Sequence, residues 1–170
     1  MNKNKNKMKS VKQIVIGMLL LGSVNVAYAQ TTDSTKQSQP TDQTKQQDNN
    51  ALVKEAIAYQ DKQDWNNALA TWKKVSASIP EWAPAYYGQG YVYQSLKDKA
   101  NAQASFEKFI ATVKPEEVEA NKQNLAYAHM YVAFALYETN KEEAKKHIAK
   151  ALEYDPNNED AKKLSKSINQ

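Results

Sequence analysis

The fold is decided by the stretch ALVKEAIAYQDKQDWNNALATWKKVSASIP, residues 51–80, because its pattern of small and bulky side chains returns further along the chain. When the chain is compared with itself at an offset of 34 residues, five positions agree in type. The pairs are Ala56 and Gly90, Tyr59 and Tyr93, Ala68 and Ala102, Trp72 and Phe106, and Val75 and Phe109. A fixed period of this length predicts a repeat protein.

These side-chain types have a physical meaning in a stack of helices. Small residues let two helices cross closely, and aromatic rings fill the space between neighbouring helices. One helix pair cannot bury its apolar face alone, so several pairs must stack. Composition agrees, because Ala, Lys, Glu, Gln and Leu favour helices, whereas 4 Gly and 5 Pro in 170 residues are few for a fold of many tight turns.

The repeat resembles the tetratricopeptide-repeat (TPR) family, whose unit is a helix pair of 34 residues with this order of small and bulky positions. A third unit is recognised from its end, at Ala144, Ile148 and Pro156, with Ala133 as the small residue of its first helix. Ala102 and Ala144 are 42 residues apart, so we expect added turns at the start of that helix. The resemblance implies an all-α fold, a right-handed α-solenoid of about three TPR helix pairs plus a C-terminal capping helix.

Capping residues help to place the helices. Asp64, Asp98 and Asn140 precede the second helices, and Asn157-Asn158 precede the last helix, where their side chains can accept from free backbone N–H groups. The predicted segments are a signal peptide (1–29), a disordered polar linker (30–50) and a TPR domain (51–170), with repeats at about 49–82, 83–116 and 117–157 and a capping helix at 158–169.

The amino terminus has the pattern of a secretory signal. A Lys-rich start is followed by an apolar core at residues 14–24 and by the small-x-small sequence Ala27-Tyr28-Ala29. The apolar core is shorter than the roughly 20 residues that a spanning helix needs. We therefore expect cleavage after Ala29, no integral membrane span in the mature chain, and a periplasmic or secreted location. The polar residues 30–50 lack the apolar surface that offsets ordering entropy.

The net charge of +4 comes from this amino terminus. Five Lys lie in the first twelve residues, and without them 18 Lys stand against 19 acidic residues. All 23 basic residues are Lys, and the chain has no Arg for bidentate contacts to phosphate or guanine. A role in nucleic-acid binding is therefore excluded.

The resemblance also implies where a partner binds, because TPR ligands usually lie in a concave groove lined by the first helix of each unit. Helical spacing predicts the groove residues Val53, Ile57, Gln60, Tyr87, Tyr91, Gln94, Tyr127, Met130, Phe134 and Tyr137. Tyr suits such a surface, because it offers contact area and a hydroxyl at low entropic cost. For Tyr87, Tyr91, Phe134 and Tyr137, packing between units or self-association is an equal alternative.

Other aromatic and small residues are predicted to form the core of the repeats. This signature comprises Ala56, Tyr59, Ala68, Trp72, Gly90, Tyr93, Ala102, Phe106, Ala133, Ala144 and Ile148. Some TPR domains clamp carboxylates with Lys, Asn and Arg, but here the corresponding positions hold Val53, Ile57, Gly88, Tyr127 and Tyr131. That class of partner is therefore not expected.

The chain is not expected to be an enzyme or to hold a cofactor or metal. Cys is absent, and of the two His, His129 is predicted to pack inside its helix pair and His147 to be solvated. No Gly-rich phosphate loop or nucleophile elbow is found. The pattern favours an exported bacterial TPR scaffold that binds another exported protein or an extended peptide. The alternatives are a structural or oligomeric part of an envelope assembly, and a glycan or small-ligand binding module.

Overall fold

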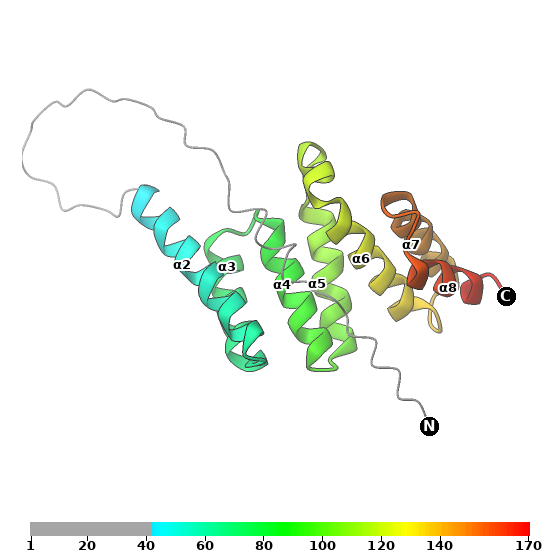
Figure 1. Ribbon diagram of the computed structural model, residues 1–170, viewed down its shortest axis with the longest axis horizontal. Helices are drawn as coiled ribbons and strands as arrows, with labels where there is room; N and C mark the ends of the chain where they lie inside the picture. Colours follow the sequence, from blue (N-terminus) through cyan, green and yellow to red (C-terminus); the bar gives the residue numbers. More distant parts are fainter. Residues whose placement is uncertain (1–41) are drawn as a thin grey trace, which may run out of the picture. The chain divides into compact units, whose positions relative to one another are not determined.

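A computed structural model of the chain describes residues 42–170. Residues 1–41, with the predicted signal peptide and most of the predicted linker, lie outside the described part. The described part contains helices and no strand (Figure 1). The α-helices are α2 (Asp42–Asp61), α3 (Trp65–Ser78), α4 (Ala83–Ser95), α5 (Lys99–Thr112), α6 (Val118–Leu136), α7 (Lys141–Tyr154) and α8 (Glu159–Ile168), and the 3-10 helix η1 (Pro115–Glu117) precedes α6.

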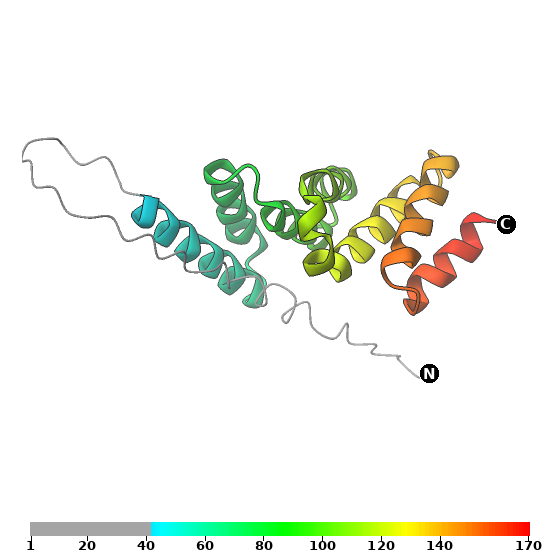
Figure 2. The same ribbon diagram turned by 90° about the horizontal axis from the view of Figure 1, so that it is seen from above.

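Each α-helix packs against the next one in the chain (Figures 1 and 2). Contact is most extensive within the pairs α2–α3, α4–α5 and α6–α7, and less so between pairs. Helix α8 packs on α7 and covers the open side of the last pair. The predicted α-solenoid of three helix pairs with a C-terminal capping helix is therefore confirmed.

The core consists of small residues, aromatic rings and aliphatic side chains that pack between successive helices. The signature residues that are buried are Ala56, Ala68, Trp72, Gly90, Ala102, Phe106, Ala133, Ala144 and Ile148. Tyr59 and Tyr93 are only half-buried, and Lys73 Nζ lies 5.5 Å from the centre of the Tyr93 ring. These two tyrosines, predicted as core residues, therefore lie at the edge of the core, because the neighbouring helices cover each of them only in part.

The first helix begins earlier than composition predicts. Helix α2 starts at Asp42, so the expectation of a disordered linker is wrong for residues 42–50. A helix that is nucleated by packing downstream extends at low cost, because each further residue adds one backbone hydrogen bond. Asn49 also contributes a tertiary contact, because its Oδ1 accepts a hydrogen bond of 2.7 Å from Ser78 Oγ on α3.

The turns inside the first two pairs share one geometry. Gln63 and Lys97, which are one period apart, both adopt a left-handed conformation with φ of 60° and 62°. Asp64 and Asp98 then cap α3 and α5, as predicted, each accepting from the backbone N–H three residues further on. Asn140 also caps α7, but no residue in its turn has positive φ. The third turn is therefore built differently.

Helix α6 carries the extra residues of the third unit. It has 19 residues, whereas its counterpart α4 has 13, and the additional length lies at its start, as predicted. Asn121 and Asn124 are buried there, and the side-chain carbonyl oxygen of each has no hydrogen-bond partner. The added turns thus bury polar groups at a cost that the regular units avoid.

Helix α4 approaches both α3 and α5 so closely that a side chain at either of its two glycines would collide with an aromatic ring. A Cβ atom added at Gly88 would lie 2.5 Å from the Trp72 ring, and one at Gly90 would lie 2.9 Å from the Phe106 ring. Trp72 and Phe106 are fully buried, so neither ring can swing into solvent. The two glycines are therefore required by packing, although glycine weakens a helix.

We predict that Gly88→Ala destabilises the fold, although Ala favours a helix by about 1 kcal/mol over Gly. The decrease in the free energy of unfolding should exceed that of Gly90→Ala, because the contact at Gly88 is closer.

Trp72→Ala leaves a cavity in the core and should lower the free energy of unfolding by about 3–5 kcal/mol. Chemical denaturation measures all three. In the Gly88→Ala background, Trp72→Phe should recover part of the loss; a stabilised Gly88→Ala protein would contradict the steric explanation.

Candidate functional site

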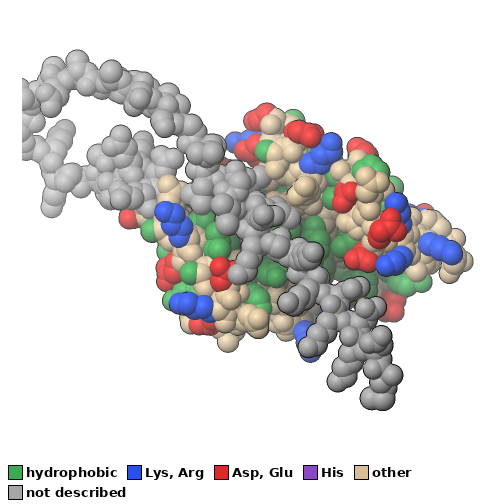
Figure 3. Space-filling model, in the orientation of Figure 1, with side chains coloured by type: hydrophobic (Ala, Val, Ile, Leu, Met, Phe, Trp, Pro, Cys, Tyr) green, Lys and Arg blue, Asp and Glu red, His purple; other side chains and the backbone are tan. Residues whose placement is uncertain are grey.

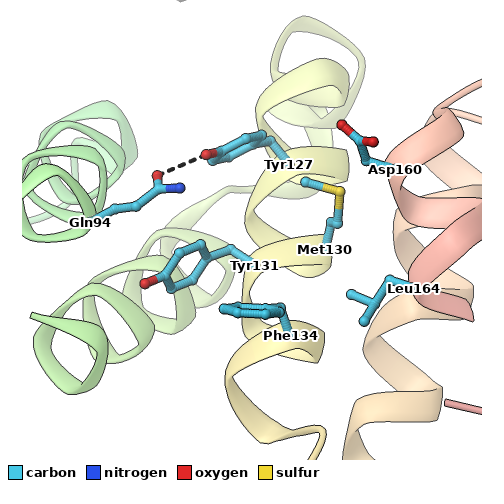
Figure 4. A pocket seen from close by; sticks show the side chains of 7 residues that line it. All are labelled: Gln94, Tyr127, Met130, Tyr131, Phe134, Asp160 and Leu164. Carbon is cyan, nitrogen blue, oxygen red and sulfur yellow. Dashed lines mark hydrogen bonds between the residues drawn. The ribbon is translucent and has the colours of Figure 1, made fainter. Parts of the chain in front are cut away.

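A pocket of about 230 Å³ lies between α4, α6 and α8 (Figure 4). Its lining residues are Gln94, Tyr127, Met130, Tyr131, Phe134, Asp160 and Leu164. Four of them, Gln94, Tyr127, Met130 and Phe134, belong to the groove predicted from the sequence. The structure therefore brings together one predicted groove residue of the second unit, Gln94, and three of the third.

The α6 side of the pocket follows from helical spacing. Tyr127, Met130, Tyr131 and Phe134 are three, four and seven residues apart, so they share one face of the helix. The buried face of the same helix carries small residues such as Ala128 and Ala133, which let α6 pack closely on its neighbours. The large side chains are therefore gathered on the pocket side.

A hydrogen bond ties α4 to α6 at the pocket wall. The Tyr127 hydroxyl donates to Gln94 Oε1 at 2.7 Å (Figure 4). Burial raises the pKa of Tyr127, so this hydroxyl stays protonated near neutral pH and remains a donor. The wall is therefore held in place before any partner arrives.

Phe134 is the most exposed aromatic element of the pocket. Its side chain is 54% exposed, and Lys99 Nζ lies 5.3 Å from the centre of its ring. On its other side, the Tyr131 ring centre is 6.3 Å away. A large apolar side chain left in contact with water is typical of a binding surface.

An aromatic contact continues toward the amino-terminal units. Tyr91 on α4 is half-buried, and its ring packs edge-on against Trp65 at the start of α3, with 6.2 Å between centres. Lys99 lies one period of 34 residues after Trp65. Its Nζ lies over the Phe134 ring of the next unit, just as Trp65 packs against Tyr91. Trp65 was not singled out from the sequence, because it lies at the start of a second helix.

Two predicted groove residues are buried instead. Val53 is 4% exposed and Tyr87 is 2% exposed. The Tyr87 ring packs edge-on against Phe106 and Phe109, with centres 5.6 Å and 5.2 Å away. Burial raises the pKa of Tyr87 far above its ordinary value. Placing Val53 in an open groove is therefore wrong, whereas Tyr87 follows its alternative of packing between units, because the neighbouring helices cover that part of the surface.

Three further predicted groove residues have structural contacts. Gln60 is half-buried and its Oε1 accepts a hydrogen bond from Trp72 Nε1. Ile57 is also half-buried. The Tyr137 hydroxyl donates to the backbone carbonyl of Ser167 on α8, at 3.3 Å. Tyr137 thus packs α6 against α8, which was one of the two alternatives for it.

Three lining residues were not among the groove residues predicted from the sequence. Tyr131, named there only as a place that clamps carboxylates in other TPR domains, is 8% exposed and lines the pocket. Asp160 and Leu164 lie on α8, which was expected only to cap the last pair. Their spacing of four residues places them on one helix face, and this was the available signal. The capping helix therefore also forms one side of the pocket.

Charged side chains are distributed unevenly over the surface. Figure 3 shows hydrophobic side chains in the middle of the visible face, whereas Lys, Asp and Glu lie mainly toward its margins. The six ion pairs identified among the described residues all join residues three apart on one helix, on exposed surface. Such pairs contribute little to stability, so apolar packing holds the helices together.

The two histidines meet between α6 and α7. The Nδ1 atoms of His129 and His147 are 3.0 Å apart, so one ring donates and the other accepts. His147 is half-buried, and the prediction that it is solvated is wrong, because it faces the imidazole of His129. The pKa of His129 is lowered to about 4, mainly by burial and then by the nearby charges of His147 and Lys150. The negative charge of Glu153 acts in the opposite direction but is the weaker effect.

His147 is shifted in the same direction by burial, which outweighs the opposing effect of Glu107 and Glu143 on its pKa. Both pKa values thus lie below the ordinary value of about 6.5 for an unfolded chain. The unfolded chain binds more protons below that pH, so the neutral pair stabilises the fold above about pH 6.5. This stability is lost as the pH falls toward the folded pKa values.

We predict that His129→Phe reduces the pH dependence of stability between about pH 7.5 and about pH 5. The Phe ring keeps a ring beside Tyr154 but cannot take up a proton. Thermal unfolding followed by circular dichroism measures the effect as the difference between the two pH profiles. Carboxylates away from the pair titrate equally in both proteins and cancel, whereas Glu153, which acts on His129, does not; superimposable profiles would show that His129 carries no pH-linked stability.

Two kinds of site are absent from the described residues. No group of three or more His, Asp and Glu side chains in residues 42–170 is arranged to hold a metal ion. Among the described helices, none combines the length and the apolar character that a membrane crossing requires.

Comparison with known proteins identifies the repeat. Residues 83–111 and 134–158 match the family model described as tetratricopeptide repeat. These segments cover the second unit and the second helix of the third, with the turn that precedes it. No curated protein matches the chain.

Solved TPR domains have a similar structure. The N-terminal domain of stress-induced protein-1 (STI-1) from C. elegans has a TM-score of 0.61 at 20% identity, covering 74% of this chain and 98% of that one. The first TPR of Spaghetti (RPAP3), bound to the HSP90 peptide SRMEEVD, has a TM-score of 0.58 at 22% identity, covering 73% and 92%. The TPR2B domain of yeast Sti1, in complex with pHsp70, has a TM-score of 0.56 at 18% identity, covering 73% and 98%. These likenesses show the fold.

Proposed function

We propose that this chain, in which two segments match the tetratricopeptide repeat, is a non-catalytic bacterial scaffold that is exported to the cell envelope and holds an extended segment of another exported protein. The observation that carries the proposal is the pocket between α4, α6 and α8, where three aromatic rings and two aliphatic side chains surround a space open to a partner. TPR domains are typically protein-interaction scaffolds, and no described group suggests catalysis.

Peptide binding by similar structures supports this function. The first TPR of RPAP3 is bound to the HSP90 peptide SRMEEVD, and TPR2B of yeast Sti1 forms a complex with pHsp70. The present chain has no Lys, Arg or Asn at the places that clamp carboxylates in such domains. Of those places, Tyr127 and Tyr131 line the pocket with rings. The proposed partner is therefore a peptide with apolar side chains.

The chemistry of the pocket favours an extended peptide. Aromatic-lined grooves bind extended and Pro-rich segments, because such segments lose little conformational entropy on binding. Aromatic side chains also dominate the energetics of protein interfaces. Phe134, held between Tyr131 and Lys99, offers the largest accessible ring, so it is proposed as the main anchor of the site.

Self-association is the second candidate function, and the exposure of Leu96 favours it. Leu96 is 38% exposed at the end of α4, outside the pocket. Together with Phe134 it places a second large apolar side chain in water. A stable oligomer that is lost on Leu96→Ala, measured by light scattering, would favour this function over capture of another protein.

We predict that Phe134→Ala abolishes capture of a partner in intact cells, because it removes the exposed ring of the pocket. Crosslinking followed by mass spectrometry identifies what is attached to the wild-type protein and to the variant. Leu96→Ala is the matched control, because it also removes an exposed apolar side chain but lies outside the pocket. Circular dichroism should be unchanged in both. Capture that survives in Phe134→Ala but not in Leu96→Ala would move the site elsewhere.

Export to the envelope is proposed from the amino-terminal pattern. The expected mature protein begins at Gln30, because the small-x-small sequence ends at Ala29. Mass spectrometry of the protein recovered from the periplasm or medium should find Gln30 as the first residue. Replacing the small side chains, in Ala27→Asp with Ala29→Asp, should block processing. An intact amino terminus on exported wild-type protein would contradict the assignment.

A further inference from the structure

We infer that the pocket between α4, α6 and α8 selects a cationic peptide: it takes one apolar side chain of an extended partner and pairs Asp160 with a Lys or Arg beside it. This inference rests on the proposed function and adds the charge of the partner to it. It follows from four features of the lining residues.

The interior of the pocket suits a single apolar side chain. Met130 on α6 and Leu164 on α8 both line it, and the rings of Tyr127 and Phe134 stand beside them (Figure 4). The volume of about 230 Å³ is large enough for one aromatic or branched aliphatic side chain. Burial of such a side chain contributes favourable binding free energy, but the hydrophobic effect is non-directional and does not select for the charge of the partner. Selection must therefore come from the rim.

The residues that line the pocket carry one formal charge, and it is negative. Of the seven lining residues, Asp160 alone is charged at neutral pH. It lies at the start of α8, across the pocket from Gln94 (Figure 4). Lys99, over the Phe134 ring, and Lys163, beside Asp160, lie outside the lining, so the only charge that a peptide meets within the lining is that of Asp160. A cation on the partner would complement Asp160, and such complementarity sets specificity more than affinity.

The present partner of Asp160 can be displaced. Lys163 Nζ lies 3.4 Å from Asp160 Oδ1, and the two side chains are 76% and 81% exposed. An exposed pair of this kind is held weakly. The neighbouring pair Glu159–Lys162 has a shorter separation of 2.9 Å but does not line the pocket. A Lys or Arg of the peptide can therefore displace Lys163 from Asp160.

Gln94 provides a polar contact on the opposite side. Its Oε1 accepts from Tyr127, which orients the side chain and leaves its Nε2 free to donate to a peptide carbonyl. Asp160 and Leu164 are four residues apart, about 6 Å along the helix axis. Alternate side chains of an extended peptide are about 6.7 Å apart on one side. When the apolar side chain of the peptide packs beside Leu164, the residue two positions away in the peptide lies near Asp160. The Lys or Arg is therefore expected at that position of the peptide.

The test compares short fluorescent peptides that carry one central Phe, Leu or Met and either Lys, Gln or Glu two positions away. Fluorescence anisotropy with the purified protein should rank them Lys above Gln above Glu. Asp160→Asn should weaken binding of the Lys peptide by about two- to fivefold, as expected for an exposed ion pair. Asp160→Lys should reverse the order. The preference should shrink at high salt, because the charges are exposed.

Glu159→Gln is the matched control, because it removes an acidic side chain from the same first turn of α8 but not from the pocket. It should bind the Lys peptide as the wild type does, and thermal unfolding should be similar for Glu159→Gln and Asp160→Asn. Equal binding of Lys, Gln and Glu peptides would overturn the charge selection and leave the proposed function standing. If no peptide binds, or if Phe134→Ala binds as well as the wild type, the peptide-binding function itself fails.

Discussion

The structure depends on the contact between the Trp72 ring and the backbone of α4 at Gly88. A side chain at that position would collide with the ring, so the first and second helix pairs can approach only through a glycine. The same arrangement recurs within the second pair, where Gly90 meets Phe106. Because each pair buries its apolar face on the next, these contacts hold successive pairs in a similar arrangement along the stack. The repeated pattern of core residues follows from them.

Helix α6 has to satisfy two demands at once. Its small residues face α5 and α7, which keeps the stack in contact, while its large residues Tyr127, Met130 and Phe134 face the pocket. A helix with apolar residues on both sides is normally buried all round. Here α8 stands off far enough to leave a space, so part of the apolar surface stays accessible. The pocket exists because α8 packs on α7 and leaves the large side chains of α6 partly open.

Periodicity placed four of the lining residues on the pocket side of α4 and α6, but it did not predict how deeply each residue lies. Tyr87 and Met130 were both placed in the groove by the same spacing, yet Tyr87 is covered by the rings of Phe106 and Phe109, and Met130 is accessible. His147 illustrates the same point, because its helix position suggests solvent while His129 on the neighbouring helix covers it. Depth depends on what the adjacent helix presents, and a pattern within one helix does not contain that information.

The sequence by itself determined the helix pairs, their period, the caps at Asp64, Asp98 and Asn140, and the added turns at the start of α6, because each depends on residues close in the chain. It also placed Gln94, Tyr127, Met130 and Phe134 on one side of the stack. Only the tertiary structure decided that α8 supplies Asp160 and Leu164 to the same pocket, and that Val53 and Tyr87 are closed off. These outcomes depend on the distance and angle between helices, which the packing of all the pairs sets together.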